Sequence, residues 1–385
     1  MKTMKISLKQ YLSKEYFAFV FVFIGMSFSP ILELTGLFIA LIILDPRDSI
    51  KNIISFKGKL FKTYCLFIII SAVTILFTVQ KYDKFFQQAI VLLAYFLLYN
   101  NVFKKIKNTH ELVKSYLDVV LGMCLYACYF MKNNRATPWG CEAGVFAGFI
   151  LPGIAYLILT NKWESLRLYI MIITGYLTFS PLFLFFLLAI LVYKFMLFER
   201  LLFLKTIFII VFCLLCSSIY ITENSNMVEL RSKKTNETFD NFSKIFDSSP
   251  IHKSDMNEST WAFVSNMRVA IHAPNRITGA GLGTHQYSYY NYFNYFGLNC
   301  EDAYSLGIRL FSEFGIIGII LLLQFFFKNF NKYNNINVSI FWGLLYLFFR
   351  GGQYILIGTI MFFYIYYYTS KRNTELNKIN LSHRC

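Results

Sequence analysis

The segment YFAFVFVFIGMSFSPILELTGLFIALIIL, residues 16–44, is a run of 29 residues with a single charged side chain, Glu33. About twenty apolar residues are enough to cross the hydrocarbon core of a bilayer as an α-helix. The run is too long for one simple span, and Ser29-Pro30 interrupts it, because proline breaks a helix. Basic residues precede the run and follow it at 47–62. The segment therefore predicts two short membrane helices in a tight hairpin with both ends in the cytoplasm.

The same apolar character extends over most of the chain. Of its 385 residues, 56% are hydrophobic and 15% are charged, whereas a soluble domain has about 25% charged residues. The mean hydropathy is +0.50. The net charge of +16 would fit a nucleic-acid partner in a soluble protein, but most lysines and arginines lie in short segments beside apolar runs, where they determine topology. The sequence therefore predicts an all-α, polytopic integral membrane protein that binds no nucleic acid.

About eleven or twelve transmembrane helices account for the apolar runs. A second long run, 168–197, is interrupted at Thr178-Phe179-Ser180-Pro181 and is expected to form another broken pair. The other expected spans lie near 60–79, 85–103, 112–131, the glycine-rich stretch up to 160, 202–221, 304–327, 340–349 and a last one up to 368. Counting spans divides the chain into an N-terminal transmembrane bundle (1–222), a large periplasmic loop (223–303), C-terminal transmembrane helices (304–370) and a cytoplasmic tail (371–385).

The expected periplasmic loop is unusual, because connections longer than about 15 residues are generally functional or disordered. Its first half, 223–258, is polar with mixed charges. From Ser259 on, apolar side chains recur at helical spacing, which predicts an amphipathic helix with Arg268 and His272 on one face. Gly279-Ala280-Gly281-Leu282-Gly283 follows. We expect a tight glycine-supported turn there and no nucleotide site, because no predicted strand precedes it and no Walker lysine follows it.

Aromatic residues dominate the next stretch, with seven in the ten residues 287–296. One interpretation is an aromatic belt at the membrane interface. The other is a platform on which sugar rings stack, with Tyr289 and Tyr292 among the contacting residues. Both remain open, and they are compatible.

Several arginines lie on the outer side under this topology, where the positive-inside bias disfavours them. A guanidinium group holds phosphate oxygens with a bidentate fork, so these side chains point to a lipid-linked phosphate or pyrophosphate ligand. A solvated loop charge or a contact with a lipid headgroup is the alternative for each one. The five are Arg135, Arg268, Arg276, Arg309 and Arg350.

Carboxylates cluster at the start of the span that follows the loop. Glu301 and Asp302 precede it, and Glu313 lies inside it. A carboxylate in a membrane helix is costly and usually marks function or a buried partner. Glu313 and Arg309 also have the spacing of a simple i, i+4 ion pair, which remains an alternative.

Three segments form a recognisable combination. The first runs from the Gly279 turn, through a variable outer segment, to a span containing Glu313-Phe314-Gly315-Ile316-Ile317-Gly318. The second is Arg135 before a glycine-rich span that ends at Leu151-Pro152, and the third is Leu177-Thr178-Phe179-Ser180. Together they resemble the O-antigen polymerase and O-antigen ligase family of bacterial inner-membrane proteins, including its Glu-x-Gly-x-x-Gly element.

The resemblance implies a metal-independent glycosyltransferase of the inner membrane, without a cofactor and with both termini in the cytoplasm. Its substrates would be undecaprenyl-pyrophosphate-linked glycans at the periplasmic face, its surroundings membrane lipids, and its expected partner a chain-length regulator in the inner membrane. Ligases carry a histidine where this chain has Tyr304, and many members have Ser-Arg where it has Ser180-Pro181. The missing histidine favours the polymerase, which joins repeat units of the O-antigen of lipopolysaccharide.

The resemblance also suggests roles for individual residues. Arg135, Arg268 and Arg276 would stabilise the pyrophosphate leaving group. Asp302, or alternatively His285, would accept the proton of the acceptor hydroxyl. The expected substrate-binding residues are His272, His285, Tyr289, Tyr292, Arg309 and Glu313.

Two other functions remain alternatives. An O-antigen ligase would transfer finished polysaccharide to the lipid A core. A flippase or transporter of lipid-linked oligosaccharide would be a protein without enzymatic activity. A flippase is expected to place charged residues in cavities at mid-membrane, whereas nearly all charges of this chain fall in predicted loops, with Glu33 as the main exception.

Overall fold

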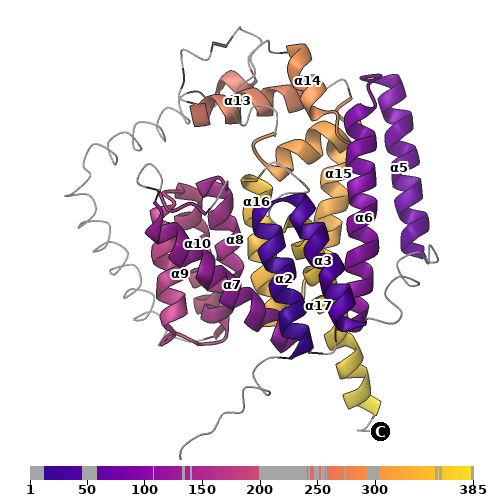
Figure 1. Cartoon of the computed structure of the whole chain (residues 1–385). Helices are drawn as coiled ribbons and strands as arrows, with labels where there is room; N and C mark the ends of the chain where they lie inside the picture. Colours follow the sequence, from indigo (N-terminus) through magenta and orange to yellow (C-terminus); the bar gives the residue numbers. More distant parts are fainter. Residues whose placement is uncertain are drawn as a thin grey trace, which may run out of the picture.

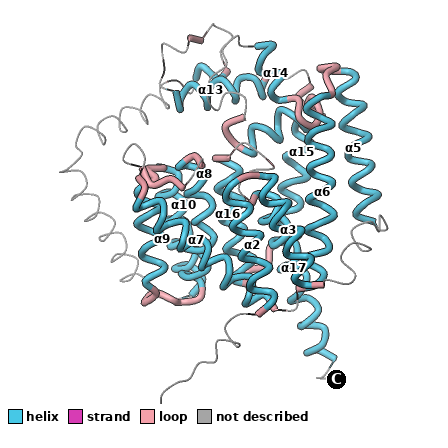
Figure 2. The backbone as a smooth tube through the Cα atoms, viewed as in Figure 1, coloured by secondary structure: helices cyan, strands magenta, loops and turns pink. Residues whose placement is uncertain are grey.

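The structure is a computed structural model, and its described part consists only of helices and their connections (Figures 1 and 2). Within this part no residue lies in a β-strand. The described residues are 13–45, 59–106, 108–131, 135–138, 141–198, 241, 243–246, 251–252, 256, 258–272, 275–292, 303–351, 354 and 358–382. The predicted span at 202–221, most of the loop's first half and the carboxylates Glu301 and Asp302 lie outside them.

Three described helices are long and apolar enough to cross a membrane: α6 (Asp83–Lys105), α7 (Thr109–Tyr129) and α15 (Leu306–Asn329). Shorter apolar helices surround them. The all-helical fold expected from composition is therefore confirmed for the described residues, and its apolar helices suggest a membrane-embedded protein. The number of spans stays a prediction.

The first apolar run forms two helices, as its proline predicts. α2 (Lys14–Phe28) and α3 (Pro30–Leu44) meet at Ser29, whose backbone is extended and whose hydroxyl accepts a hydrogen bond from the amide of Leu32. Gly25 and Gly36 allow the two backbones to touch, because a Cβ at either position would overlap the main chain of the other helix. The break in the second long run is also confirmed, between α9 (Leu166–Leu177) and α10 (Pro181–Phe198).

The lone carboxylate of the first run connects two helices. Glu33 is buried, and Tyr95 of α6 donates a hydrogen bond of 2.9 Å to one of its oxygens. Tyr99, one turn further along α6, donates to the other oxygen. Glu33 therefore links α3 to α6 through these hydrogen bonds, which explains a carboxylate inside an apolar run.

The centre of the bundle is α8 (Ala143–Leu159), which is buried along nearly its whole length. It packs against α16 (Asn335–Phe349), where Gly343 accommodates the ring of Pro152. α5 (Lys59–Phe77) pairs with α6 at the edge of the bundle, and α17 (Thr359–Ser382) runs from the bundle to the C-terminus (Figure 1).

Two helices of the polar segment cover one end of the bundle, which we call the capped end. They are α13 (Glu258–Ile271) and α14 (His285–Tyr292), and the C-terminus lies at the opposite end (Figure 1). The amphipathic helix predicted from Ser259 on is thus confirmed as α13. The cap has a hydrophobic core of its own, formed by Ile245, Ile251, Met256, Trp261, Val264, Val269 and Tyr289.

Candidate functional site

α15 is interrupted near the capped end. Gly315 has φ 61° and ψ −158°, a conformation that only glycine adopts readily. The break frees backbone groups on both sides, and the chain at 276–281 fills it. Four hydrogen bonds of 2.8 to 3.1 Å join the segments: Ala280 N to Ser312 O, Gly281 N to Glu313 O, Ile316 N to Arg276 O and Ile317 N to Ile277 O. Discontinuous membrane helices of this kind often form ligand sites.

The same loop is attached to the α5–α6 hairpin. The hydroxyl of Ser71 accepts a hydrogen bond of 2.7 Å from the amide of Leu282, and Thr78 donates one of 2.9 Å to the carbonyl of Ala280. Gly279, Gly281 and Gly283 all have positive φ. The predicted glycine-supported turn is therefore confirmed, and it joins α5 to the broken α15.

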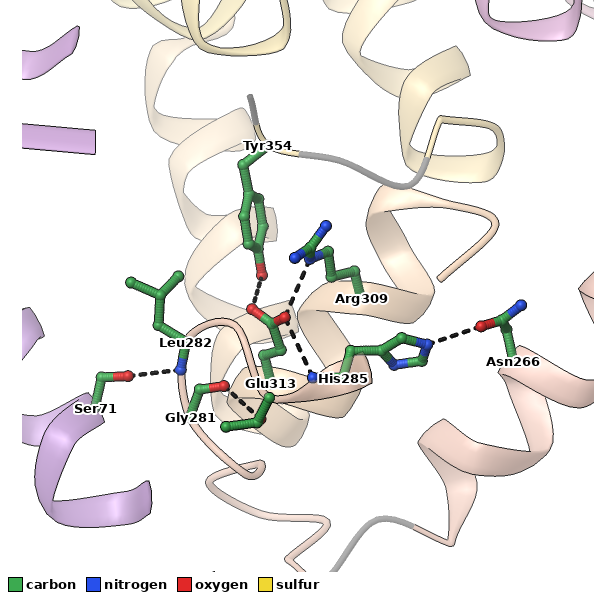
Figure 3. A network of polar contacts seen from close by, with 9 residues as sticks. Ser71, Asn266, Gly281, Leu282, His285, Arg309, Glu313 and Tyr354 are labelled. Atoms are coloured by element: carbon green, nitrogen blue, oxygen red, sulfur yellow. Dashed lines mark hydrogen bonds and ion pairs between the residues drawn. The ribbon is translucent and has the colours of Figure 1, made fainter. Parts of the chain in front are cut away.

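Glu313 lies at the centre of this junction, with its side chain fully buried (Figure 3). Arg309 donates from Nε to Oε1 at 3.1 Å, which confirms the predicted i, i+4 ion pair. Tyr354 donates to Oε2 at 2.9 Å, and the backbone amide of His285 lies 3.5 Å from Oε1. The guanidinium group of Arg309 also lies over the ring of Tyr354, 4.9 Å from its centroid. The carboxylate is therefore held by donors from three separate segments.

The hydrogen bonds of His285 define its protonation. Asn266 donates from Nδ2 to the carbonyl of Ala262 at 2.6 Å, so its Oδ1 faces His285 Nε2 at 2.8 Å as an acceptor. Nε2 therefore carries the hydrogen. Burial, and secondarily the charge of Arg309, lower the pKa of His285 to about 3, so the ring is neutral. Its Nδ1 has a free lone pair, is buried and has no hydrogen-bond partner among the described residues.

A mostly apolar cavity of about 620 Å³ begins at this junction. Glu313, Tyr354 and Ser71 are among its lining residues, and its other walls come from α5, α6, α15 and α17. Ile70, Ile317 and Leu321 are exposed apolar residues of its lining. The site therefore joins a buried charged group to a space suited to a hydrocarbon chain.

The other predicted residues of the polar segment differ in position. Arg268 is only 2% exposed and lies in α13, and His272 follows directly after that helix, half-buried. Arg276 is an exposed residue, and its backbone carbonyl accepts the hydrogen bond from Ile316 at the break in α15. Tyr289 is buried in the core of the cap, so its ring is not an exposed platform for a sugar, and that interpretation is corrected for this position. The side chains of Tyr292 and Asp302 lie outside the described residues.

Arg135 belongs to a second polar centre. Its Nε donates to the carbonyl of Thr178 at 3.1 Å, in the turn between α9 and α10. Arg350, at the end of α16, forms an ion pair with Glu142 at the start of α8. The guanidinium group of Arg350 lies over the ring of Tyr304, 4.2 Å from the centroid. Arg135 and Arg350 thus both lie near the start of α8 and the turn before α10, and the joint action of Arg135, Arg268 and Arg276 stays a prediction.

Sequence reasoning missed the residues that support each centre. Tyr354 and Asn266 hold Glu313 and His285, and Glu142 pairs with Arg350. They belong to different segments from their partners, and no local spacing connects them. The buried carboxylate in a membrane helix was the one signal that predicted the first centre.

Comparison with known proteins gives no family for the chain: no protein-family model and no curated protein matches it. Its function is therefore argued from the site.

Proposed function

We propose that the protein is an O-antigen polymerase, which joins undecaprenyl-pyrophosphate-linked repeat units at the capped end. One observation carries the proposal. A charged, hydrogen-bonded centre around Glu313 lies at the head of an apolar cavity between membrane-embedded helices. A ligand that fills both parts has a polar head and a hydrocarbon chain, as a lipid-linked glycan does.

Charge supports a periplasmic position for the capped end. α6 and α15 both begin at that end, and they finish with Lys104-Lys105 and with Lys328 at the opposite end. Lysines mark the cytoplasmic side of inner-membrane proteins. Both termini would then be cytoplasmic, and the glycan would be handled outside the cytoplasm, where nucleotide sugars are absent.

The proposed reaction is a single displacement at the anomeric carbon of the growing chain. The bond between this carbon and the pyrophosphate oxygen breaks, and a bond to the acceptor hydroxyl oxygen of a new lipid-linked unit forms, with inversion. Nδ1 of His285, held ready by Asn266, accepts the hydroxyl proton. Asp302, the first candidate from the sequence, is the alternative base in this proposal. Arg268 and Arg276 stabilise the negative charge that develops on the leaving pyrophosphate.

The arginine–carboxylate pair has a positioning role in this mechanism. Glu313 accepts hydrogen bonds from Arg309, Tyr354 and the backbone at His285, so it fixes the start of α14 against α15. Because the pair is buried, removing one partner would leave an uncompensated charge and displace the base.

The proposal is tested by deleting the gene in its host and separating the surface lipopolysaccharide on a gel. A core that carries a single repeat unit identifies the polymerase. Bare core with polymer on undecaprenyl pyrophosphate means a ligase, and bare core with single units at the cytoplasmic face means a flippase; either result contradicts the proposal.

Complementing the deletion strain with variants of the gene tests which residues belong to the site. Glu313→Gln should give single-unit lipopolysaccharide at a normal protein level. The matched control is Glu164→Gln, since Glu164 is exposed in the connection between α8 and α9 and should restore full polymer. Full polymer with Glu313→Gln would remove that centre from the mechanism.

A further inference from the structure

The second polar centre contains more positive than negative charge. The ends of α16 and α8 supply the ion pair of Arg350 with Glu142, and Arg350 is only 15% exposed at its side chain. Arg135 comes from a separate loop and is attached to Thr178 through Nε alone. Its two terminal nitrogens bond to no described residue. The described residues of this centre thus supply two guanidinium groups and one carboxylate, which pairs with Arg350.

A series of short contacts connects Arg135 to Arg350. Arg135 is bonded to Thr178, and Ser180, two residues further, lies 2.9 Å from the hydroxyl of Tyr346. That hydroxyl donates to the carbonyl of Gly144 at 2.7 Å, and Arg350 lies directly against Gly144.

The electrostatics agree with this proximity. Burial, and then the charge of Arg135, lower the pKa of Arg350 to about 10. Burial also lowers the pKa of Arg135. Both guanidinium groups stay charged at neutral pH, and Glu142, paired with Arg350, neutralises one of the two positive charges. An anion between them would remove the repulsion between the two guanidinium groups.

The N-termini of two helices add positive electrostatic potential near the two arginines. α8 begins at Ala143, beside Arg350, and α10 begins at Pro181, directly after the turn that holds Arg135. A helix N-terminus carries partial positive charge and free amide groups, which favour a phosphate. The fork of a guanidinium group matches two phosphate oxygens.

We propose that Arg135 and Arg350 form a second anion site, which binds the pyrophosphate head of the second lipid-linked substrate. This inference rests on the proposed function, because joining two lipid-linked units requires places for two pyrophosphate groups. Under the proposed function, Arg268 and Arg276 serve one of them. The ring of Tyr304 contacts Arg350 of the second centre and Phe263 of α13.

Calorimetry on the full-length protein in detergent tests the site with inorganic pyrophosphate as the probe. Arg135→Gln is the decisive variant, because it leaves the ion pair of Arg350 intact and relieves the repulsion. We expect at least tenfold weaker binding at one of two sites and no loss of thermal stability. The matched control, Arg167→Gln, removes an exposed arginine that pairs with Asp118, and should bind as the wild type does.

Competition identifies the source of the phosphate. Undecaprenyl pyrophosphate should displace the probe from the site that Arg135→Gln weakens, whereas phosphatidylglycerol should not. Equal displacement by phosphatidylglycerol would make the site a contact for bulk lipid headgroups and overturn the assignment. Unchanged binding in Arg135→Gln would overturn it too. These measurements need no polymer formation, so they can fail or succeed independently of the proposed function.

Discussion

Replacing Gly315 with alanine tests how the broken helix α15 holds the site. The conformation at Gly315 is reserved for glycine, and forcing another residue into it costs about 1–3 kcal/mol. The new Cβ would also overlap the carbonyl of Ile277, so the inserted loop would have to withdraw. Its four backbone hydrogen bonds contribute about 0.5–1.5 kcal/mol each. Together these effects predict a loss of about 3 kcal/mol or more.

The chain offers a matched control in Gly122 of α7. A Cβ at this position meets no atom within 4 Å, and alanine is favoured over glycine in a helix by about 1 kcal/mol. Gly122→Ala should therefore be neutral or slightly stabilising.

The assay combines thermal unfolding in detergent with amide hydrogen exchange. Gly315→Ala should lower Tm relative to Gly122→Ala, and the amides of Ala280 and Gly281 should exchange about a hundredfold faster, since about 3 kcal/mol corresponds to two powers of ten. Exchange within threefold of the wild type, with an unchanged Tm, would show that the loop does not depend on this break.

Three further substitutions test individual contacts. Burial lowers the pKa of His285 from 6.5 to about 3, so below pH 6.5 the unfolded state binds a proton that the folded state does not. The free energy of unfolding therefore falls as the pH falls from 6.5 toward 3, and between pH 7 and 5 the wild type should lose about 2 kcal/mol relative to His285→Gln in thermal unfolding. Tyr354→Phe removes a donor to the buried carboxylate and should cost about 1.5–3 kcal/mol and shorten the polymer, whereas Tyr333→Phe, at an exposed ring, should leave Tm and polymer length unchanged. Glu33→Ala leaves two buried phenols without their acceptor and should lower Tm, while equal stability would contradict its role as a joint between helices.

Local signals in the sequence predict the helices well. Apolar runs and their prolines indicate the breaks at Ser29 and Ser180, and the clustered glycines predict the turn at 279–283. These features depend on hydropathy and backbone geometry within a few residues. The pair of Arg309 and Glu313 follows from helical spacing in the same way.

Such local signals do not predict contacts between segments that are far apart in the sequence. Gly315 lies in a continuous apolar stretch, and nothing local indicates that the chain near Arg276 fills a break there. The pairing of Arg350 with Glu142 depends on how α8 and α16 pack. Tyr289 lies in the core of the cap, which the aromatic stretch does not predict, because an interfacial ring and a core ring look alike in sequence.

The most direct test of the central claim uses the purified protein in vesicles with a synthetic undecaprenyl-pyrophosphate-linked repeat unit of the host. Products are separated by length, and released undecaprenyl pyrophosphate is measured. We predict a ladder of two or more units with one undecaprenyl pyrophosphate released for each bond formed, and no ladder with His285→Gln. Single units that remain intact, or that only cross the bilayer, would contradict the assignment as a polymerase.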